Sequence, residues 1–338
     1  METFNHIAVS SRIRLARNFS GINFVNKLND EKQINFLLSS TKALFENIEG
    51  FSYTRLSKMP LSRCSAFLER HIISKELIEN RDISAIATNE DENIIVMIAE
   101  EDHLREQSIS SGFDLQGAYD RLIPIDNKIL NHFNIAFDDE YGFLTSSPAN
   151  LGTGMRASVM VFIPALERRG KIPSLVADAR KYGLTFRGIY GEGTEASGCF
   201  YQISNQNSLG LSEEQIIDKV SDFFLDICKM EESLRNDLFE NNYTELRDEA
   251  QRAYGILTSC YSIEENEMIR LLSILKFGSL YGFVKIKDDN MFMKLYYHGA
   301  SSNLKEITKF SLEKQESVVR SEYISKRVKN LVSIGGER

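Results

Sequence analysis

The chain has 338 residues, of which 26% are charged, and its formal net charge is −8. This length allows one large domain or two ordinary ones, and the acidic balance argues against nucleic acid as the main ligand. No apolar run approaches the ~20 residues that a membrane helix needs, and the first residues lack the apolar core of a signal peptide. We therefore expect a cytoplasmic protein that does not enter a membrane.

The first part of the chain predicts an antiparallel sheet with helices packed on it. Residues 10–17 alternate arginine with apolar side chains, so that on a strand Arg12 and Arg14 would share one face and Ile13 and Leu15 the other. Further strands are expected at residues 84–88, 94–99, 141–146, 157–163, 187–190 and 200–204, and a helix at residues 114–133, which Pro124 should kink or split.

The last third predicts helices, because all five prolines fall within the first 173 residues. Ser212 followed by Gln215, and Ser262 followed by Glu265, have the spacing of helix capping boxes. We therefore predict an α+β domain over residues 1–232 and a helical domain over residues 233–338. The four cysteines have neither CxxC nor zinc spacing, which favours free thiols in a reducing compartment.

Four segments combine a strand end with arginine and a flexible or acidic loop: residues 10–17, 99–105, 144–158 and 187–195. Taken singly, each has a plain structural explanation, such as an exposed edge strand, an acidic turn that caps a helix, or a hairpin loop. A metal site at Glu101, Asp102 and His103 is conceivable, but the spacing matches no standard metal motif, and the phosphate-binding GxxxxGK[ST] order is absent. Together, converging arginines would form a cage for a triphosphate, and two glutamates a fork for a planar cation.

The motifs SSRIRLAR, EEDHLR, LTSSPANLGTGMRAS, RGIYGEGTE and YQISN, in this order over residues 7–230, resemble the catalytic domain of the phosphagen kinases, the ATP:guanido phosphotransferase family. Within that family the chain is similar to the bacterial protein arginine kinases. The arginine motif starts at Ser10, so the preceding helical domain of classical members is expected to be missing, and a proline-free tail follows the catalytic part instead.

The resemblance implies the roles of individual residues. Glu101 and Glu192 would grip the guanidinium, with Glu101 as the base, and Ser147 stands where the family has a catalytic cysteine. Mg²⁺ would be held by phosphates and water, so no protein ligand to a metal is expected. The implied ATP-binding residues are Ser11, Arg12, Ile13, Arg14, His71, Arg105, Arg156, Ser158, Met160, Arg187, Gly188 and Gly191.

The sequence departs from the family pattern at three places. A serine hydroxyl at Ser147 cannot carry the negative charge of a thiolate at neutral pH. Gln202 replaces an aspartate, and the tail segment EKQESVVRSEY replaces a motif that recognises phosphoarginine in the relatives, which puts an allosteric phosphoarginine site at Arg320 in doubt.

The implied function is transfer of the γ-phosphoryl group of MgATP to arginine side chains of proteins, as a mark in stress response and degradation. Two alternatives stay open: a kinase of a free guanidino metabolite, and an inactive nucleotide-binding adaptor, of which Ser147 would be a sign. Besides substrate proteins with exposed arginines, the resemblance implies an activating adaptor, a heat-shock repressor as a substrate, a Clp-type unfoldase, and a homodimer formed through the helical tail.

Overall fold

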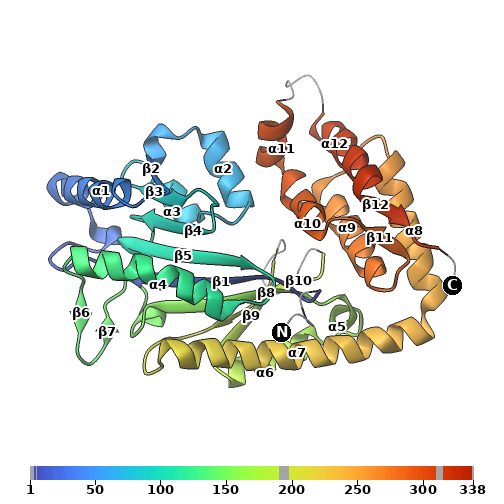
Figure 1. Ribbon diagram of the computed structural model, residues 1–338, viewed down its shortest axis with the longest axis horizontal. Coiled ribbons are helices and arrows are strands. Elements are labelled where there is room, and N and C mark those ends of the chain that lie inside the picture. Colours follow the sequence, from blue (N-terminus) through green and yellow to red (C-terminus); the bar gives the residue numbers. More distant parts are fainter. Residues whose placement is uncertain (1–3, 5, 190–197, 310–314, 337–338) are drawn as a thin grey trace.

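The structure is a computed structural model that describes residues 4, 6–189, 198–309 and 315–336 (Figure 1). Its first half contains β1 (Ala8–Arg17), α1 (Glu31–Glu46), β2 (Phe51–Arg55), α2 (Leu61–Glu69), α3 (Lys75–Glu79), β3 (Ala85–Asn89), β4 (Ile94–Ile98), β5 (Leu104–Ser111), α4 (Leu115–His132), β6 (Phe137–Asp138), β7 (Gly142–Phe143) and β8 (Met155–Phe162). Then follow α5 (Pro164–Arg168), α6 (Ile172–Lys181), β9 (Leu184–Gly188), β10 (Phe200–Asn205), α7 (Glu213–Asn241), α8 (Tyr243–Ser259), α9 (Glu265–Leu280), β11 (Val284–Ile286), α10 (Asp289–His298), α11 (Ser301–Thr308), α12 (Glu316–Leu331) and β12 (Val332–Ile334). None of the helices in these ranges is long and apolar enough to cross a bilayer.

Eight strands form one antiparallel sheet in the order β2-β3-β4-β5-β1-β8-β10-β9. This confirms the predicted antiparallel sheet and the α+β class. Neighbours far apart in the sequence, such as β1 and β8, pair at the centre of the sheet, where the hydrogen bonds of both strand edges are satisfied.

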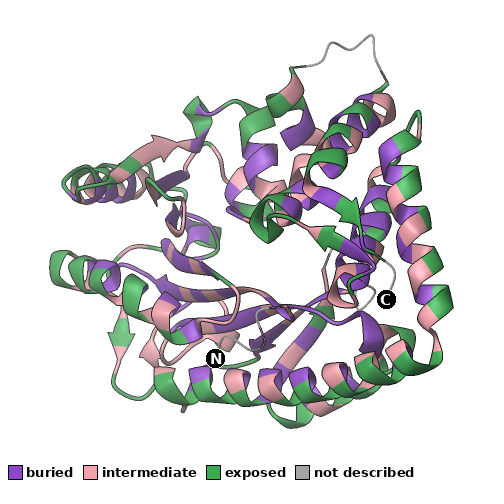
Figure 2. Ribbon diagram, turned by 45° about the vertical axis from the view of Figure 1, so that its right-hand side comes forward, coloured by how far each residue is buried: buried purple, intermediate pink, exposed green. Residues whose placement is uncertain are grey.

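The two faces of the central strands have different environments. Ile13 and Leu15 of β1 are buried against α4, α6 and α7, which lie along one face of the sheet (Figure 1). Figure 2 shows the strands as mostly buried, and α7 as a helix on which buried and exposed residues alternate. The opposite face is covered by α2 and α3 over β3 and β4, through a separate core cluster. Arg12 and Arg14 point to this second face, as predicted from the alternation.

Several predicted elements differ in detail. The helix from Asp114, its amino-terminal cap, is neither split nor ended by Pro124, because that proline lies on the exposed side, where the freed carbonyl of Asp120 can be hydrated. The strand expected at residues 141–146 is reduced to two residues, Gly142–Phe143.

Of the two expected capping boxes, the one at Ser212 and Gln215 is formed. The one at Ser262 is not, because α9 begins after Glu264, which makes no side-chain cap. The main chain of Ile263 is instead held by Ser317 and Arg320 of α12, so this tertiary contact determines where the helix starts.

The carboxyl-terminal helices α8–α12 surround an apolar core that Phe162, Ala165 and Phe200 of the sheet domain also enter, and they carry a two-stranded sheet, β11–β12, that the proline-free pattern did not indicate. The predicted domain boundary after residue 232 falls within α7. Arg320 is buried in this part, where its guanidinium donates to the carbonyls of Gly299 and Ile263 and pairs with Glu316. In this conformation Arg320 is therefore engaged within the helical part.

Glu231 of α7 fixes α5 to the rest of the domain. Its side chain is 1% exposed, and its two oxygens accept from the N–H groups of Ala165 and Leu166, each at 2.9 Å. Burial raises the pKa of Glu231 to about 7, although the two N–H donors oppose the shift.

A pH-dependent contribution to stability follows. Because the pKa of Glu231 is higher in the folded chain than its ordinary value, its contribution is present at low pH and lost as the pH rises toward 7. Relative to Glu231→Gln, whose amide does not titrate, the wild type should lose thermal stability between about pH 5 and about pH 8. Thermal unfolding of the wild type and of Glu231→Gln across this pH range checks this prediction. A difference in Tm between the two proteins that stays constant with pH would contradict the raised pKa of Glu231.

Candidate active site

A cavity of about 700 Å³ opens on the sheet face that α4, α6 and α7 leave free. Its wall is mostly polar, and charged residues from four strands, from the loop after β4 and from α3 meet there. The lining residues are Arg14, Val25, Asn26, Ser74, Glu76, Glu79, Asn80, Glu100, Glu101, Arg105, Ser146, Arg156, Arg187 and Gln202.

The strand register explains why arginines distant in sequence converge. Arg14 of β1 lies directly opposite Arg156 of β8, while Ala16 lies opposite Arg105 of β5. At the other edge, Arg187 of β9 lies opposite Gln202 of β10. Directly opposite residues of an antiparallel pair point to the same face, so these guanidinium groups share one surface.

The electrostatics of this surface favour an anion. Burial lowers the pKa of Arg14 well below its ordinary value, and the positive charges of Arg105, Arg12, Arg156 and Arg187 lower it further. The pKa of Arg156 falls to about 10, through burial and then through Arg187 and Arg105. The Nε atoms of Arg14 and Arg156 are buried without a hydrogen-bond acceptor. Because such crowding of like charge is unfavourable, a polyphosphate fits the group well.

A smaller cavity of about 80 Å³ continues from this surface and is lined by Ser10, Arg12, His71, Ser158, Met160, Ile189 and Gln202. Arg12 lies opposite Ser158 in the sheet, and Met160 lies opposite Gln202. His71 reaches it from the turn after α2, with a left-handed φ of 56°. Burial, and then the charge of Arg12, lower the pKa of His71 to about 4, so the imidazole is neutral at pH 7.

The loop between β4 and β5 carries the acidic run at residues 100–102. Ala99 turns the chain with a left-handed φ of 57°, and its N–H donates to the carbonyl of His103 at 2.9 Å. This conformation is costly for a residue with a side chain. It directs Glu100 inward, where Glu100 is 2% exposed and forms an ion pair with Arg105, and leaves Glu101 exposed at the cavity.

Asp102 and His103 hold this loop in place. One oxygen of Asp102 accepts from Nδ2 of Asn18 and from the N–H of Ser146, each at 2.7 Å, and Nδ1 of His103 accepts from the N–H of Phe19 at 3.0 Å. Both side chains are thus occupied by protein partners. Within the described part of the chain, no group of three or more His, Cys, Asp or Glu side chains is arranged to hold a metal ion.

Glu101 lies beside the arginine face in an environment that makes its carboxylate more basic than usual. Desolvation raises its pKa, and the charges of Asp102 and Glu100 raise it further, while Arg105 opposes them. The Oγ of Ser146 donates to the main-chain carbonyl of Glu101 at 2.9 Å, which ties the loop after β7 to the acidic loop. Ser147 follows directly and precedes a short 3-10 helix at Pro148–Asn150, to which its side chain makes no capping bond, and Ser147 itself does not line the cavity.

The structure brings most of the predicted nucleotide-binding side chains together, with two exceptions. The side chain of Ile13 is in the core, and that of Ser11 is buried, with its Oγ donating to the carbonyl of Gly112. Any nucleotide contact by these two residues would involve their main chain. Gly188 ends β9 at the edge of the site, while Gly191 and Glu192 lie outside the described residues.

Glu100 and Gln202 were not among the predicted site residues, although both line the cavity. Gln202 could have been found from alternation, because it shares a face of β10 with Ser204, whose Oγ accepts from Arg156 at 3.0 Å. The position of Glu100 depends on the left-handed turn at Ala99, which carries no local sequence signal.

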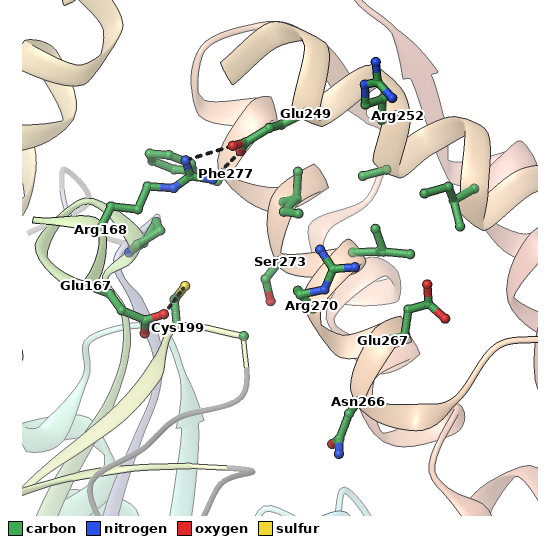
Figure 3. Close-up of a pocket in the computed structure, with 16 residues that line it drawn as sticks. Glu167, Arg168, Cys199, Glu249, Arg252, Asn266, Glu267, Arg270, Ser273 and Phe277 are labelled. Atoms are coloured by element: carbon green, nitrogen blue, oxygen red, sulfur yellow. Dashed lines mark hydrogen bonds and ion pairs between the residues drawn. The ribbon is translucent and has the colours of Figure 1, made fainter. Parts of the chain in front are cut away.

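A larger cavity, of about 1010 Å³, lies between α5 and the helices α8 and α9 (Figure 3). In this cavity Arg168 pairs with Glu249, and Sγ of Cys199 donates to Glu167 at 3.3 Å. The desolvated thiol and the neighbouring Glu167 raise the pKa of Cys199 above the range in which it would ionise. Size alone therefore does not identify the active site, because the arginines of the sheet face line the smaller cavities instead.

Comparisons with known proteins agree with this geometry. Residues 33–234 match the family described as ATP:guanido phosphotransferase, C-terminal catalytic domain. Residues 243–335 match the protein-arginine kinase McsB C-terminal domain. The structure resembles a lombricine kinase, with a TM-score of 0.61 and 26% identity over 69% of this chain and 68% of that one. It also resembles the duplicated taurocyamine kinase of Schistosoma mansoni, with a TM-score of 0.61 and 31% identity over 67% of this chain and 33% of that one, so the likeness spans about a third of the duplicated protein.

Full-length relatives give the same result at higher similarity. The chain is 37% identical to the protein-arginine kinase of Clostridium acetobutylicum over 329 residues, which are 96% of this chain and 97% of the relative. It is 35% identical to that of Clostridium tetani over 328 residues, 96% of each chain. The two matched domains, the arginine face and the near-complete coverage show that the chain belongs to the protein-arginine kinases of the ATP:guanido phosphotransferase family.

Proposed function

We propose that this protein is an ATP-dependent protein arginine kinase, which transfers the γ-phosphoryl group of ATP to the guanidinium of arginine side chains in proteins. The observation that carries the proposal is the convergence of five arginines beside the exposed carboxylate of Glu101. One group of residues suits a polyphosphate, and the other suits a cationic acceptor.

The arginine face would act through charge and alignment. Phosphoryl transfer requires that the attacking and leaving atoms lie in line and that the charge on the transferred group is neutralised. Arg14, Arg156 and Arg187 lie on strands β1, β8 and β9 of one sheet, so they are held in place before the substrate arrives. Arg12, His71 and Met160 line the smaller cavity, which we assign to the base and ribose.

Glu101 would supply the base for the acceptor. A guanidinium has a pKa above about 12, so its nitrogen is a poor nucleophile while fully protonated. As the nitrogen bonds to the γ-phosphorus and the bond to the departing ADP oxygen breaks, the proton released from the nitrogen passes to Glu101. The raised pKa of Glu101 favours this transfer. We propose Glu192 as the second carboxylate of the fork.

Further parts of the proposal come from the family resemblance. Mg²⁺ would accompany ATP and be held by phosphates and water, since it keeps much of its hydration shell. Substrates would include a heat-shock repressor, and an activating adaptor and a Clp-type unfoldase would be partners. We also propose homodimerisation through the helical part and a cytoplasmic location, which the four free cysteines support.

A kinase of a free guanidino metabolite is the second candidate, because the structural neighbours include a lombricine kinase and a taurocyamine kinase. Mass spectrometry separates the two. An arginine-containing protein such as casein, and free arginine, are each incubated with this protein and MgATP, and analysed at neutral pH to preserve the acid-labile P–N bond. Phosphoarginine in the protein alone supports the proposal. Product on the free amino acid alone supports the metabolite kinase. No product on either substrate means that an activator is missing or that the site is inactive, and restoring cysteine at Ser147 separates these two explanations.

Ser147→Cys should raise kcat with little change in the KM for ATP. Ser147 lies at the amino-terminal end of a short 3-10 helix and follows Ser146, which lines the cavity, and a cysteine at this position would ionise far more readily than a serine. A thiolate there would add one charge-assisted hydrogen bond to the guanidinium, worth ~1.5 kcal/mol, or roughly tenfold in rate. Steady-state kinetics on a protein substrate check it. An unchanged or lower kcat would mean that this position does not contact the acceptor.

A further inference from the structure

The carboxyl-terminal part holds the end of α2 through one carboxylate. Glu69 is the last residue of α2, and its oxygens accept from the N–H of Ser302 at 2.8 Å, the N–H of Asn303 at 2.9 Å and Nδ2 of Asn303 at 2.8 Å. The same Nδ2 also donates to the carbonyl of Ala66 at 3.0 Å. Figure 1 shows α11, which begins at Ser301, beside α2.

This contact engages two N–H groups in the first turn of α11. A carboxylate at a helix amino terminus satisfies N–H groups that have no partner within the helix and meets the positive end of the helix dipole. Asn303 is only 5% exposed, so its two side-chain bonds are shielded from water. Charge-assisted hydrogen bonds of this kind are stronger than neutral ones, and they join two parts of the chain that are more than two hundred residues apart.

His71 lies two residues beyond Glu69. Its N–H donates to the carbonyl of Leu68 at 2.9 Å, and the N–H of Ile72 donates to that of Phe67, also at 2.9 Å, so the left-handed turn is attached to the last turn of α2. The carbonyl of Ile72 in turn accepts from Nε2 of Gln107 in β5 at 2.6 Å. The imidazole therefore enters the small cavity from a segment fixed on both sides, by α11 through α2 and by the sheet.

We propose that Glu69 is a positioning residue for the nucleotide: by joining the start of α11 to the end of α2, it holds His71 in the cavity that also contains Arg12 and Met160. The carboxyl-terminal helical part would thereby set the affinity for ATP without contacting it. This inference rests on the proposed function, which assigns His71 to the base and ribose of ATP.

Weakening the contact from either side, by loss of the Glu69 charge or of the Asn303 side-chain donor, should act in the same direction. In full-length Glu69→Gln and Asn303→Ala, we expect the dissociation constant and KM for ATP to rise about fivefold to tenfold, the usual range of coupling between sites, with kcat within about twofold of wild type. The KM for the protein substrate should not change. Calorimetric titration with ATP and steady-state kinetics give these values, and thermal unfolding shows that the variants are folded at the assay temperature.

Glu231→Gln is the matched control. Glu231 also caps a helix of another segment with two N–H bonds, but that helix is α5, and Glu231 does not contact α2 or α11. If loss of a buried helix cap weakened ATP binding merely by loosening the fold, Glu231→Gln would weaken it to the same degree as Glu69→Gln. That outcome, or unchanged ATP affinity in both Glu69→Gln and Asn303→Ala, would overturn the proposal.

A double-mutant cycle with His71→Ala tests the route. If Glu69 acts through His71, Glu69→Gln should change ATP affinity little when His71 is already alanine, whereas a full additional fivefold to tenfold loss would contradict that route. His71→Ala alone also separates the two levels of the argument. Unchanged ATP binding in that variant would refute the nucleotide-site assignment itself. Weakened binding there, with none in Glu69→Gln, would refute only the role of Glu69.

Discussion

Glu101→Gln should lower kcat for protein phosphorylation by roughly a hundredfold to ten-thousandfold, the usual contribution of a general base. Glutamine has nearly the same shape but can neither accept the proton nor attract the guanidinium by charge. The Glu101 side chain is exposed on its loop and no part of the core, so ATP affinity and thermal stability should stay close to wild type. Quantitative mass spectrometry of phosphoarginine under single-turnover conditions measures the rate of transfer. Calorimetric titration measures the affinity for ATP.

Glu90→Gln provides the control for this experiment. Glu90 is an exposed acid in the turn that enters β4, whereas Glu101 lies in the turn that leaves it, so the same substitution is made at the far end of one strand. This variant should retain wild-type turnover. The wild-type rate should also fall as the pH drops through the raised pKa of Glu101, because the base must be ionised. A kcat above about a tenth of wild type in Glu101→Gln would remove Glu101 from the role of base.

Arg17→Met should destabilise the fold by about 3–5 kcal/mol, the cost of leaving a buried charge without its partner. Arg17 is 2% exposed, donates to both oxygens of Asp126 at 2.9 and 2.8 Å, and lies over the ring of Phe143 at 3.7 Å. Glu106 is buried in the same region, where burial and then Asp126 raise its pKa well above the ordinary value. A loss of this size is a large share of the ~5–15 kcal/mol that stabilises a typical domain.

Urea unfolding followed by circular dichroism gives this free energy. The double variant Arg17→Met with Asp126→Leu should regain part of the loss, because replacing both partners of a buried pair by apolar groups leaves no orphaned charge. If Arg17→Met alone unfolded at the wild-type urea concentration, the pair would be irrelevant to stability.

The sequence predicted which face of a strand each side chain lies on, but it did not predict which strands pair with one another. Alternation in residues 10–17 correctly put Arg12 and Arg14 on one face and Ile13 and Leu15 on the other, because the side-chain period of a strand is local. It could not show that β1 pairs with β5 and β8, since that choice depends on packing between segments more than eighty residues apart. Only the family resemblance assigned these arginines to a common site before the structure was known.

Local signals failed where tertiary contacts were stronger. The capping spacing at Ser262 was ordinary, but the bond from Arg320 to the carbonyl of Ile263 keeps that segment extended. Similarly, three consecutive acids at residues 100–102 have similar propensities, yet one pairs with Arg105, one bonds to Asn18, and one is left exposed at the cavity. The backbone turn at Ala99, rather than residue type, makes that distinction.

The division of the central strands into two faces has a consequence for how such a protein can diverge. In the middle of β1, Arg12 and Arg14 line the cavities while Ile13 and Leu15 are buried in the core, so natural selection acts on neighbouring codons for unrelated reasons. A point substitution affects one requirement and spares the other. Insertion or deletion of a single residue within the strand exchanges the two faces, and so destroys both at once. Lineages of this enzyme should therefore tolerate substitutions in β1 far better than changes in its length.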